Sequence, residues 1–366
     1  MRRPRVLMVG PAPTSTGGMA AVIASYINHW DDSRYSLNFV STWSSHRSSI
    51  VERCIQAAKA WLLCGSALLS SRPDIVHIHF THRGSFFRKA GVLALTRALT
   101  SAKIILHCHS SEFASFYEAR GTLLRAFVRR TLSSADLIIV VAGYWGEYFR
   151  ALCPGITPLV VYNPVDIPAR VPAQADREQA ILTLGALGHR KGTYDILRAV
   201  PSVLAACPRA RFWLGGDGDV EAVAGSVAAA PWGSSVHLLN WIEGQEKDTY
   251  LDRAAVFLLP SYAEGLPVAV LEAMAHGLAV ITTPVGGIPE AIERDQTGVF
   301  VQPGDVSAIA SACIELLKDE DRRISLATSA RRRAQEQFDA SRIMAQVYEV
   351  YDGLLSRSQT RSTERL

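Results

Sequence analysis

Short apolar runs rich in β-branched residues recur along the chain and alternate with longer stretches of helical spacing. The runs lie at residues 6–10, 37–42, 75–80, 104–109, 137–142 and 159–163, and again at 181–185, 211–216, 236–241, 256–261, 279–283 and 299–302. Stretches with helical spacing include residues 50–69, 123–132, 194–206, 268–276 and 306–317. Apolar runs that alternate with helices predict βαβ units and mostly parallel, buried sheets.

The rhythm breaks once, which indicates two domains. Residues 164–179 contain three prolines and show no periodicity, as is typical of a linker. We therefore predict a first domain over residues 1–165, a linker over 166–179 and a second domain over 180–339. Residues 340–366 should form a helix that crosses back to the first domain, followed by a polar tail. A chain of 366 residues also exceeds what one core usually supports.

The lengths of the apolar runs and the spacing of the cysteines indicate the cellular compartment in which the protein is found. No uninterrupted apolar run reaches about 18 residues, so a membrane span is not expected. The start, Met1 to Gly10, reads as a first strand and not as a secretory signal. Six scattered cysteines without paired spacing favour reduced thiols. These features predict a cytoplasmic protein, at most peripheral on the inner face of the plasma membrane.

Charge is distributed unevenly between the two halves. Residues 1–165 carry 18 Lys and Arg against 8 Asp and Glu, a net of +10, whereas residues 166–366 carry 20 against 26, a net of −6. A basic half favours an anionic surface as partner. Because the cations are interleaved with long apolar helical faces, membrane headgroups or a lipid-linked phosphate fit better than nucleic acid. Ordinary solvated basic faces are the alternative.

The strongest chemical signal follows the apolar run at 256–261. Glu264 lies in a predicted loop, and Pro267 is suited to be the first residue of the helix that follows. Glu272 then lies about five residues inside that helix. The second carboxylate then lies roughly 7–8 Å along the helix axis. The helix N-terminus between the two acids is a suitable binding site for a diphosphate, and each carboxylate can accept hydrogen bonds from hydroxyl groups. By spacing alone, a loop acid and an unrelated helix-face acid are an equally good interpretation.

The segment E-G-L-P-V-A-V-L-E-A-M-A-H-G at 264–277 resembles the signature of the family 4 retaining glycosyltransferases. Residues 284–290 and 297–298 resemble that family in order and spacing, and the likeness spans nearly the whole chain, most strongly 181–303. The resemblance implies an α/β protein of GT-B fold, with two Rossmann-like domains facing each other across a cleft. It implies a nucleotide-diphosphate sugar as donor. Glu264 should contact the donor sugar at the catalytic centre and Glu272 the ribose, with Gly265, Leu266, Pro267 and Val268 lining the donor.

A second motif, G-A-L-G-H-R-K-G at 185–192, lies between a predicted strand and a helix. Its glycines permit close backbone approach, and Lys191 offers a point charge for phosphate. The family usually has Gly-Arg-Leu followed by Lys-Gly, with both cations on the diphosphate. Here Ala186 stands where the family has arginine. Either Arg190 supplies the missing charge, or donor binding is weakened; a solvated basic turn is the third interpretation.

Other glycine and aromatic positions resemble the family more weakly. Gly216, in a Gly-Asp-Gly turn, should line the nucleotide pocket, and Trp241 with Ile242 should meet the base, although a core tryptophan is an even alternative. Gly17 and Gly18, after the first strand, resemble the loop that abuts the transferred sugar and acceptor. A simple strand-to-helix turn would look the same.

Histidines gather at two neighbouring strand ends of the first domain. The family places a histidine at His109, beside the anomeric centre, so His109 is the catalytic candidate; a structural histidine is the alternative. His77 and His79 share a strand face, as do His107 and His109, and four imidazoles could in principle bind zinc. No carboxylate-rich pattern accompanies them, and the family requires no metal. We therefore predict no metal and no cofactor.

An acceptor site is suggested by the cations after the third apolar run. Arg83, Arg88 and Lys89 stand among aromatic residues and would suit a lipid-borne pyrophosphate at a membrane surface. A merely basic helix start is an equally good interpretation.

Together these residues predict a retaining hexosyl-type glycosyltransferase. It should move a sugar from a nucleotide-diphosphate donor to a glycan or lipid-linked acceptor in surface polysaccharide biosynthesis, by a same-face mechanism assisted by the leaving diphosphate. Two rivals remain. A sugar-nucleotide epimerase shares this architecture, and a catalytically weak sugar-nucleotide-binding protein is suggested by Ala186.

Overall fold

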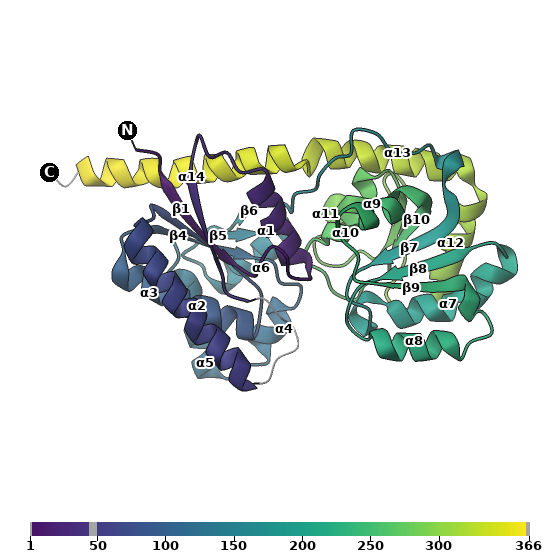
Figure 1. The fold of residues 1–366 in the computed structure, drawn as a ribbon, viewed down its shortest axis with the longest axis horizontal. Helices are drawn as coiled ribbons and strands as arrows, with labels where there is room; N and C mark the ends of the chain where they lie inside the picture. Colours follow the sequence, from purple (N-terminus) through teal and green to yellow (C-terminus); the bar gives the residue numbers. More distant parts are fainter. Residues whose placement is uncertain (1, 44–49, 364–366) are drawn as a thin grey trace. The chain divides into compact units, whose positions relative to one another are not determined.

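The computed structural model describes residues 2–43 and 50–363, which form two compact units (Figure 1). The first unit combines residues up to Pro164 with those from Ala340 onward, and the second runs from Val165 to Asp339. The stretch expected to be a linker groups with the second unit, and a short 3-10 helix, η1 (Gln174–Asp176), lies within it. Each unit contains one six-stranded parallel sheet, as the alternation of apolar runs and helical stretches predicted.

The first unit has the strand order β2-β1-β3-β4-β5-β6. Its strands are β1 (Arg5–Gly10), β2 (Ser36–Ser41), β3 (Ile75–Phe80), β4 (Lys103–Cys108), β5 (Leu137–Val140) and β6 (Leu159–Val160). Its helices are α1 (Gly18–Asn28), α2 (Ile50–Ser71), α3 (Gly84–Leu99), α4 (Phe113–Glu118), α5 (Thr122–Ser133), α6 (Gly143–Leu152) and α14 (Ala340–Thr363). β3 is buried along its whole length, as expected of a parallel strand with both faces covered.

The last helix, α14, belongs to this first unit. The Tyr348 hydroxyl accepts a hydrogen bond from the backbone N–H of Asp31 at 2.6 Å, and the Tyr348 ring stacks on Tyr35 with centroids 5.7 Å apart. Tyr351, one turn further along, is fully buried. The C-terminal helix is therefore part of the core of a unit whose other elements all precede residue 165.

The second unit has the strand order β12-β11-β10-β7-β8-β9. Its strands are β7 (Glu178–Leu184), β8 (Arg211–Gly215), β9 (Val236–Asn240), β10 (Ala254–Leu259), β11 (Ala279–Thr282) and β12 (Val299–Phe300). Its helices are η2 (His189–Lys191), α7 (Thr193–Ala206), α8 (Val220–Ala228), η3 (Gly233–Ser235), α9 (Gly244–Arg253), α10 (Val268–Ala275), α11 (Ile288–Ala291), α12 (Val306–Lys318) and α13 (Glu320–Gln337). The candidate motifs follow β7, β8, β9 and β10, at the carboxyl edge where parallel sheets bind ligands.

At two candidate site residues, Pro267 and His109, the element boundary lies one residue away from the sequence expectation. Pro267 has ψ 118° and caps α10 instead of opening it, so the helix begins at Val268. β4 ends at Cys108, which leaves His109 as the first residue beyond the strand. Across residues 2–43 and 50–363, no helix combines the length and the apolar character that a membrane crossing requires.

Candidate functional site

The loop after β10 buries the first motif glutamate against a lysine. Glu264 is 5% exposed, and its Oε1 accepts hydrogen bonds from Lys191 Nζ at 2.6 Å and from Ser261 Oγ at 2.7 Å. Arg190 donates to the carbonyl of Ala263 at 3.2 Å and places Nη1 3.8 Å from Glu264 Oε2. The structure thus brings together two cations from η2 and one carboxylate from the β10 loop, 73 residues away in sequence.

Two glycines make this packing possible. Gly286 has φ +56°, and a Cβ there would lie 1.9 Å from the carbonyl oxygen of Glu264. The next residue, Gly287, donates its N–H to the Gly265 carbonyl at 2.7 Å. Gly216 has φ +153°, and a Cβ there would lie 1.8 Å from the carbonyl oxygen of Gly185. Any side chain at either position would push apart the loops that hold the site.

The second motif glutamate has its own lysine. Glu272, on α10, accepts a hydrogen bond at 2.5 Å from Lys247 Nζ, which comes from α9. Burial lowers the pKa of Lys247, but the carboxylate of Glu272 outweighs it, so the pKa lies above its ordinary value. Sequence reasoning missed Lys247, because α9 carries mostly polar residues and lacks a strong apolar stripe. The sequence signal that could have revealed Lys247 is that it is the one lysine between the apolar runs at residues 236–241 and 256–261.

The first turn of α10 lies between the two glutamates in sequence. Gly265, Leu266 and Pro267 are buried, and Val268 is half-buried as the first helical residue. A helix N-terminus presents backbone N–H groups and a positive partial charge, which favour an anion. The loop therefore contributes shape and backbone donors, whereas the charged groups come from η2, α9 and the two glutamates.

The turn at Gly216 is joined to the Lys191 motif by backbone hydrogen bonds. The N–H of Leu187 donates to Asp217 at 2.6 Å, and the N–H of Asp219 donates back to Leu187 at 2.9 Å. After β9, Trp241 is 36% exposed, with Nε1 3.2 Å from Glu243 Oε2, whereas Ile242 is buried. A core role for Trp241 is therefore excluded.

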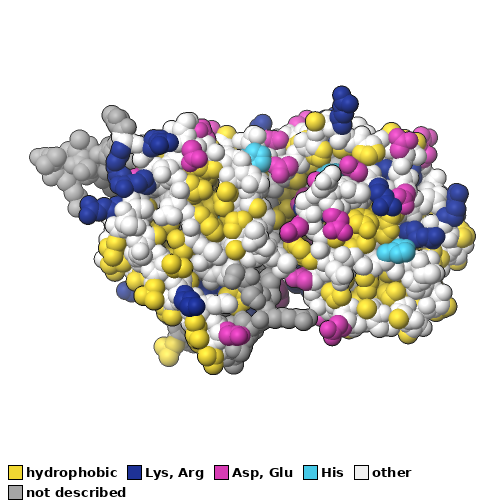
Figure 2. All heavy atoms as spheres, viewed as in Figure 1, with side chains coloured by type: hydrophobic (Ala, Val, Ile, Leu, Met, Phe, Trp, Pro, Cys, Tyr) yellow, Lys and Arg dark blue, Asp and Glu magenta, His cyan; other side chains and the backbone are white. Residues whose placement is uncertain are grey.

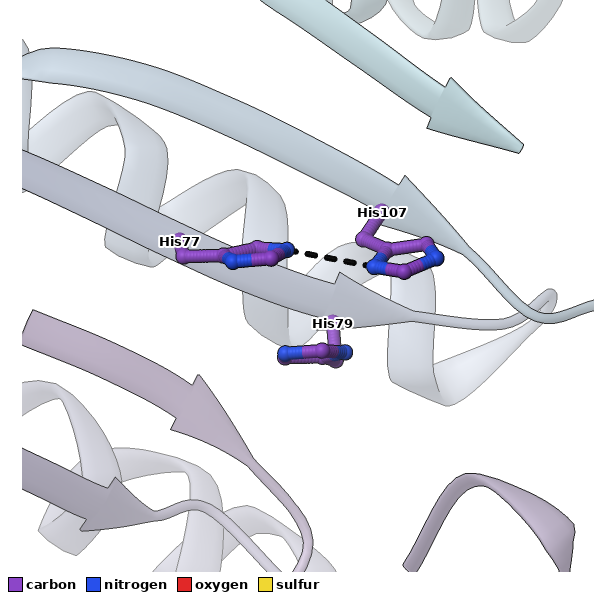
Figure 3. A group of neighbouring side chains, drawn as sticks. All are labelled: His77, His79 and His107. Atoms are coloured by element: carbon purple, nitrogen blue, oxygen red, sulfur yellow. Dashed lines mark hydrogen bonds between the residues drawn. The ribbon is translucent and has the colours of Figure 1, made fainter. Parts of the chain in front are cut away.

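In the first unit, four imidazoles stack where β3 and β4 end. His79 and His107 are register partners in the sheet. His77 Nε2 lies 3.2 Å from His107 Nδ1, as Figure 3 shows, and His79 Nδ1 lies 2.9 Å from His109 Nε2. Burial lowers the pKa of His77 and of His109 to about 3, so both rings are neutral near pH 7.

The nitrogens of this cluster come close enough to suggest a metal site. One imidazole nitrogen from each of His77, His79 and His107 lies within 4.8 Å of the other two. The rings, however, are close to parallel: the interplanar angle is 17° between His77 and His79, 13° between His77 and His107 and 30° between His79 and His107. Lone pairs lie in the ring planes, so stacked rings do not aim them at one point, as tetrahedral zinc requires (Figure 3). The geometry fits a hydrogen-bonded stack instead.

The glycine loop of the first unit occupies the start of α1. Gly17 caps the helix with φ +113°, and Gly18 is its first residue. A Cβ at Gly17 would meet no described atom within 4 Å, so the conformation, and not crowding, favours glycine there. The contact of this loop with a sugar stays a prediction from the sequence.

The three cations expected to bind the acceptor differ in their exposure and in the groups that they contact. Arg83 is exposed and caps α3 with φ +53°, and the Arg88 guanidinium lies 4.5 Å from the centre of the Trp43 ring. Lys89 was expected at the surface, but it is 2% exposed and donates to Thr42 Oγ1. Burial lowers the pKa of Lys89 to about 7. Its place on the inner face of α3, against the end of β2, corrects the idea of a surface-exposed lysine.

Two protein-family models match the two halves of the chain. The family described as Glycosyltransferase Family 4 matches residues 16–168, and that described as Glycosyl transferases group 1 matches residues 178–319. The chain belongs to the family 4 glycosyltransferases. The second match contains the Glu264, Lys191 and Glu272 motifs, and the first contains His109.

Curated relatives agree with this assignment. The chain is 27% identical over 237 residues to the amylovoran biosynthesis glycosyltransferase AmsK of Erwinia amylovora, covering 62% of this chain and 58% of the relative. It is 28% identical over 224 residues to a glycogen synthase of Mycobacterium tuberculosis, covering 60% and 54%. The chain thus spans somewhat more than half the length of these family 4 and related enzymes.

Solved structures show the fold. A sucrose-phosphate synthase from Thermosynechococcus elongatus superposes with a TM-score of 0.84 at 18% identity, covering 97% of this chain and 100% of that one. The Anabaena protein HepE, in complex with UDP and glucose, superposes with a TM-score of 0.74 at 15% identity, covering 96% and 100%. The fold of this family 4 chain is therefore GT-B, as the sequence predicted.

Proposed function

We propose that this chain transfers a sugar, with retention, from a nucleotide-diphosphate donor to a glycan or lipid-linked acceptor in surface polysaccharide or glycolipid biosynthesis. The observation that carries the proposal is the cluster of Lys191, Arg190 and Glu264 beside the start of α10. It combines cations, a helix N-terminus and a buried acceptor-only group, which are what a sugar diphosphate needs.

In this proposal the donor diphosphate binds to the η2 cations, Lys191 and Arg190. An ammonium has three donors, and Lys191 uses one of them on Glu264, which leaves others for phosphate oxygens. Arg190 stands beside Lys191 and can take the place of the arginine that Ala186 lacks. Charge builds on the diphosphate as the glycosidic bond breaks, so these cations stabilise the transition state more than the ground state.

In this proposal the two glutamates bind different parts of the rest of the donor. Glu264, buried and held by Lys191 and Ser261, accepts hydroxyls of the transferred sugar. Glu272, held by Lys247, accepts the ribose hydroxyls. Gly216, Trp241 and Ile242 line the base.

The reaction needs no metal or cofactor in this proposal. Lys191, Arg190 and the first turn of α10 supply the positive charge that a metal ion would otherwise bring to the diphosphate. The leaving diphosphate takes the acceptor proton on the same face, which gives retention without an enzyme nucleophile. In this proposal His109 is the residue that the family places beside the anomeric centre; since its imidazole is neutral, it positions groups and does not transfer protons.

The acceptor is proposed to be lipid-linked and reached at an anionic membrane surface by the first unit. Its helices expose large apolar side chains, among them Leu62 on α2 (74% exposed) and Leu123 on α5 (89%). Arg129 and Arg130 are exposed on the same α5 helix. Figure 2 shows apolar and cationic side chains mixed on the face that carries these helices. Apolar insertion combined with basic charge is the pattern of peripheral binding to anionic lipid.

A panel of UDP-, GDP- and ADP-sugars tests the proposal, with thermal shift to find the donor and product analysis to find the reaction. UDP-glucose is included first, because the structural relative HepE was solved with UDP-glucose. Transfer to a lipid-linked or glycan acceptor supports the proposal. Conversion of the sugar nucleotide without an acceptor would show an epimerase, and binding without turnover would show a binding protein.

A further inference from the structure

Helix α9 carries the lysine that holds Glu272, but little apolar packing holds the helix itself. Leu251 is the buried residue of α9, and the rest of Gly244–Arg253 is exposed or half-buried. Since most helices in proteins owe their stability to an apolar face packed on the core, polar contacts must do much of this work for α9. The 2.5 Å contact between Lys247 and Glu272 therefore depends on what else fixes α9.

A buried arginine binds the carboxyl ends of α9 and α10 at the same time. Arg177, just before β7, is 8% exposed. Its Nη1 lies 2.7 Å from the carbonyl oxygen of Leu251, 3.0 Å from that of Asp252 and 2.9 Å from that of Ala254. Its Nη2 donates to the carbonyl of His276 at 2.5 Å. The last carbonyls of a helix lack partners within the helix, so one guanidinium satisfies both helix ends.

The side chain of His276 links the same two helices. This buried residue caps α10, and its backbone N–H donates to the Glu272 carbonyl at 2.9 Å. A carboxylate only accepts hydrogen bonds, so the ring Nδ1 donates to Asp252 Oδ1, at 2.8 Å. The ring Nε2 lies 3.7 Å from Asp248 Oδ1. The ring thus lies between two carboxylates that are one turn apart on α9.

These contacts lie one helical turn from the ion pair that they serve. Glu272 and His276 are four residues apart, so they project from neighbouring turns of α10. Sliding α9 along α10 would break the bonds made by Arg177 and by His276 together. Hydrogen bonds to charged groups are about twice as strong as neutral ones, so this movement is costly. The distance between Lys247 and Glu272 is therefore set by groups that belong to neither residue.

We propose that Arg177 and His276 are positioning residues for the ribose end of the donor, because they fix α9 against α10 and thereby keep Lys247 on Glu272. This inference rests on the proposed binding of ribose by Glu272. Neither positioning residue needs to touch the donor, since both act through α9. Without them, Glu272 keeps its place on α10 but loses the ammonium group that orients its carboxylate.

Nucleotides with and without ribose hydroxyls test this positioning. Calorimetry identifies which of UDP, GDP and ADP binds the full-length protein, and that nucleotide is compared with its 2′,3′-dideoxy form. Wild type should bind the ribonucleotide at least about tenfold more tightly, because its hydroxyls donate to a carboxylate. His276→Leu should reduce this ratio to within about threefold and leave the affinity for the dideoxy form within about twofold. An equal loss for both nucleotides would show a merely structural role and overturn the proposal.

Further variants separate positioning from helix capping. In His276→Asn the amide nitrogen can take the place of Nδ1 as donor, so the ratio should be kept. Arg177→Met should reduce the ratio, and Arg177→Lys, which keeps a cation, should reduce it less. Arg331→Met is the matched control: Arg331 also caps α10, at the Ala275 carbonyl, but its other partner is the Pro168 carbonyl and not α9. It should lower stability and keep the ratio. A wild-type ratio in folded His276→Leu would refute the positioning role.

A second measurement needs no nucleotide. Urea unfolding of Lys247→Met, Glu272→Gln and the double variant gives the coupling energy of this pair. In the His276→Leu background the coupling should fall to about half or less. An unchanged coupling there, or no coupling in wild type, would overturn the proposal. If wild type binds ribonucleotide and dideoxynucleotide equally, the ribose role in the proposed function fails, while the coupling energy still decides this inference.

Discussion

The Nζ atom of Lys191 lies 2.6 Å from Oε1 of Glu264, and both side chains are almost fully buried. A second lysine, Lys247, lies 2.5 Å from Glu272 in the same unit. Each glutamate of the E-x7-E motif is thus held by one lysine from a different element. The motif works as two ion pairs placed by the fold around the N-terminus of α10, and it is not simply a pair of acids on one loop and helix.

Breaking the buried pair should cost far more stability than breaking an exposed one. Lys191→Met leaves Glu264 buried without its ammonium, so the free energy of unfolding should fall by about 3–5 kcal/mol. Urea unfolding measures this. Arg253→Met is the matched control, because its pair with Glu178 is about half exposed and should be worth at most about 1 kcal/mol. Equal losses in the two variants would show that the Lys191 pair is not buried in solution.

The strands and the charged motifs were predictable, but several partners were not. Each strand of the two described sheets coincides with a short apolar run, most clearly in β3 and β10, because parallel strands buried on both faces are apolar along their length. Lys247 was missed since its partner lies 25 residues away on another helix. Lys89 was expected at the surface because lysine is rarely buried, and only the position of Thr42 reveals its partner.

The Glu272 prediction concerns the ribose. Glu272→Ala should weaken binding of the free nucleoside diphosphate by roughly 1.5–3 kcal/mol, the size of a hydrogen bond to a charged group. Lys247→Met should weaken it too, because Glu272 would lose the group that orients it. Calorimetry measures both, with Thr249→Ala, exposed on the same α9 helix, as control. Unchanged affinity in folded Glu272→Ala would remove the ribose role.

The Arg190 prediction concerns the missing arginine at position 186. Arg190→Ala should lower kcat more than donor affinity, because the diphosphate gains charge as it leaves. Adding Ala186→Arg to that variant should recover part of the loss. Steady-state kinetics tests this, with Arg211→Ala, an exposed cation on β8, as control. Wild-type turnover in Arg190→Ala would make Arg190 a solvated turn residue.

The membrane prediction separates charge from apolar insertion. The protein should float with anionic liposomes at low salt, and less with neutral liposomes or at high salt, because screening weakens the attraction. Arg129→Ser with Arg130→Ser should remove the preference for anionic lipid, and Leu123→Ser should reduce binding to both. Ile324→Ser, 40% exposed on α13 in the other unit, is the control. Equal binding to both lipids by wild type would leave only a solvated basic face.

The histidine stack should make the protein sensitive to mild acid. Burial lowers the pKa of His77 and of His109 to about 3, and it holds the pKa of His79 and of His107 well below the usual range. Below about pH 6.5 the unfolded chain binds protons that the folded chain does not, so folding loses stability as the pH falls. Below pH 6.5 and above its folded pKa, each imidazole should contribute a loss of up to about 1.4 kcal/mol per pH unit.

The groups facing the stack do not offset this loss. Tyr26 on α1 and Tyr351 on α14 pack against the rings, and burial raises the pKa of both phenols, so they stay neutral in this range. Lys89 on α3 adds a positive charge, which opposes a proton on His79 further. No described group that faces the rings is anionic, so protonation inside the fold finds no stabilising partner.

Urea unfolding at pH 7.5, 6.5 and 5.5 measures the slope. His77→Leu should be less stable than wild type at pH 7.5 but lose stability less steeply below pH 6.5, because one titrating ring is gone. Val76→Ala, also fully buried on β3, should lower stability at every pH without changing the slope. If His77→Leu and wild type keep the same slope, the imidazole at position 77 can take up a proton in the folded state. The stack would then be open to water in solution.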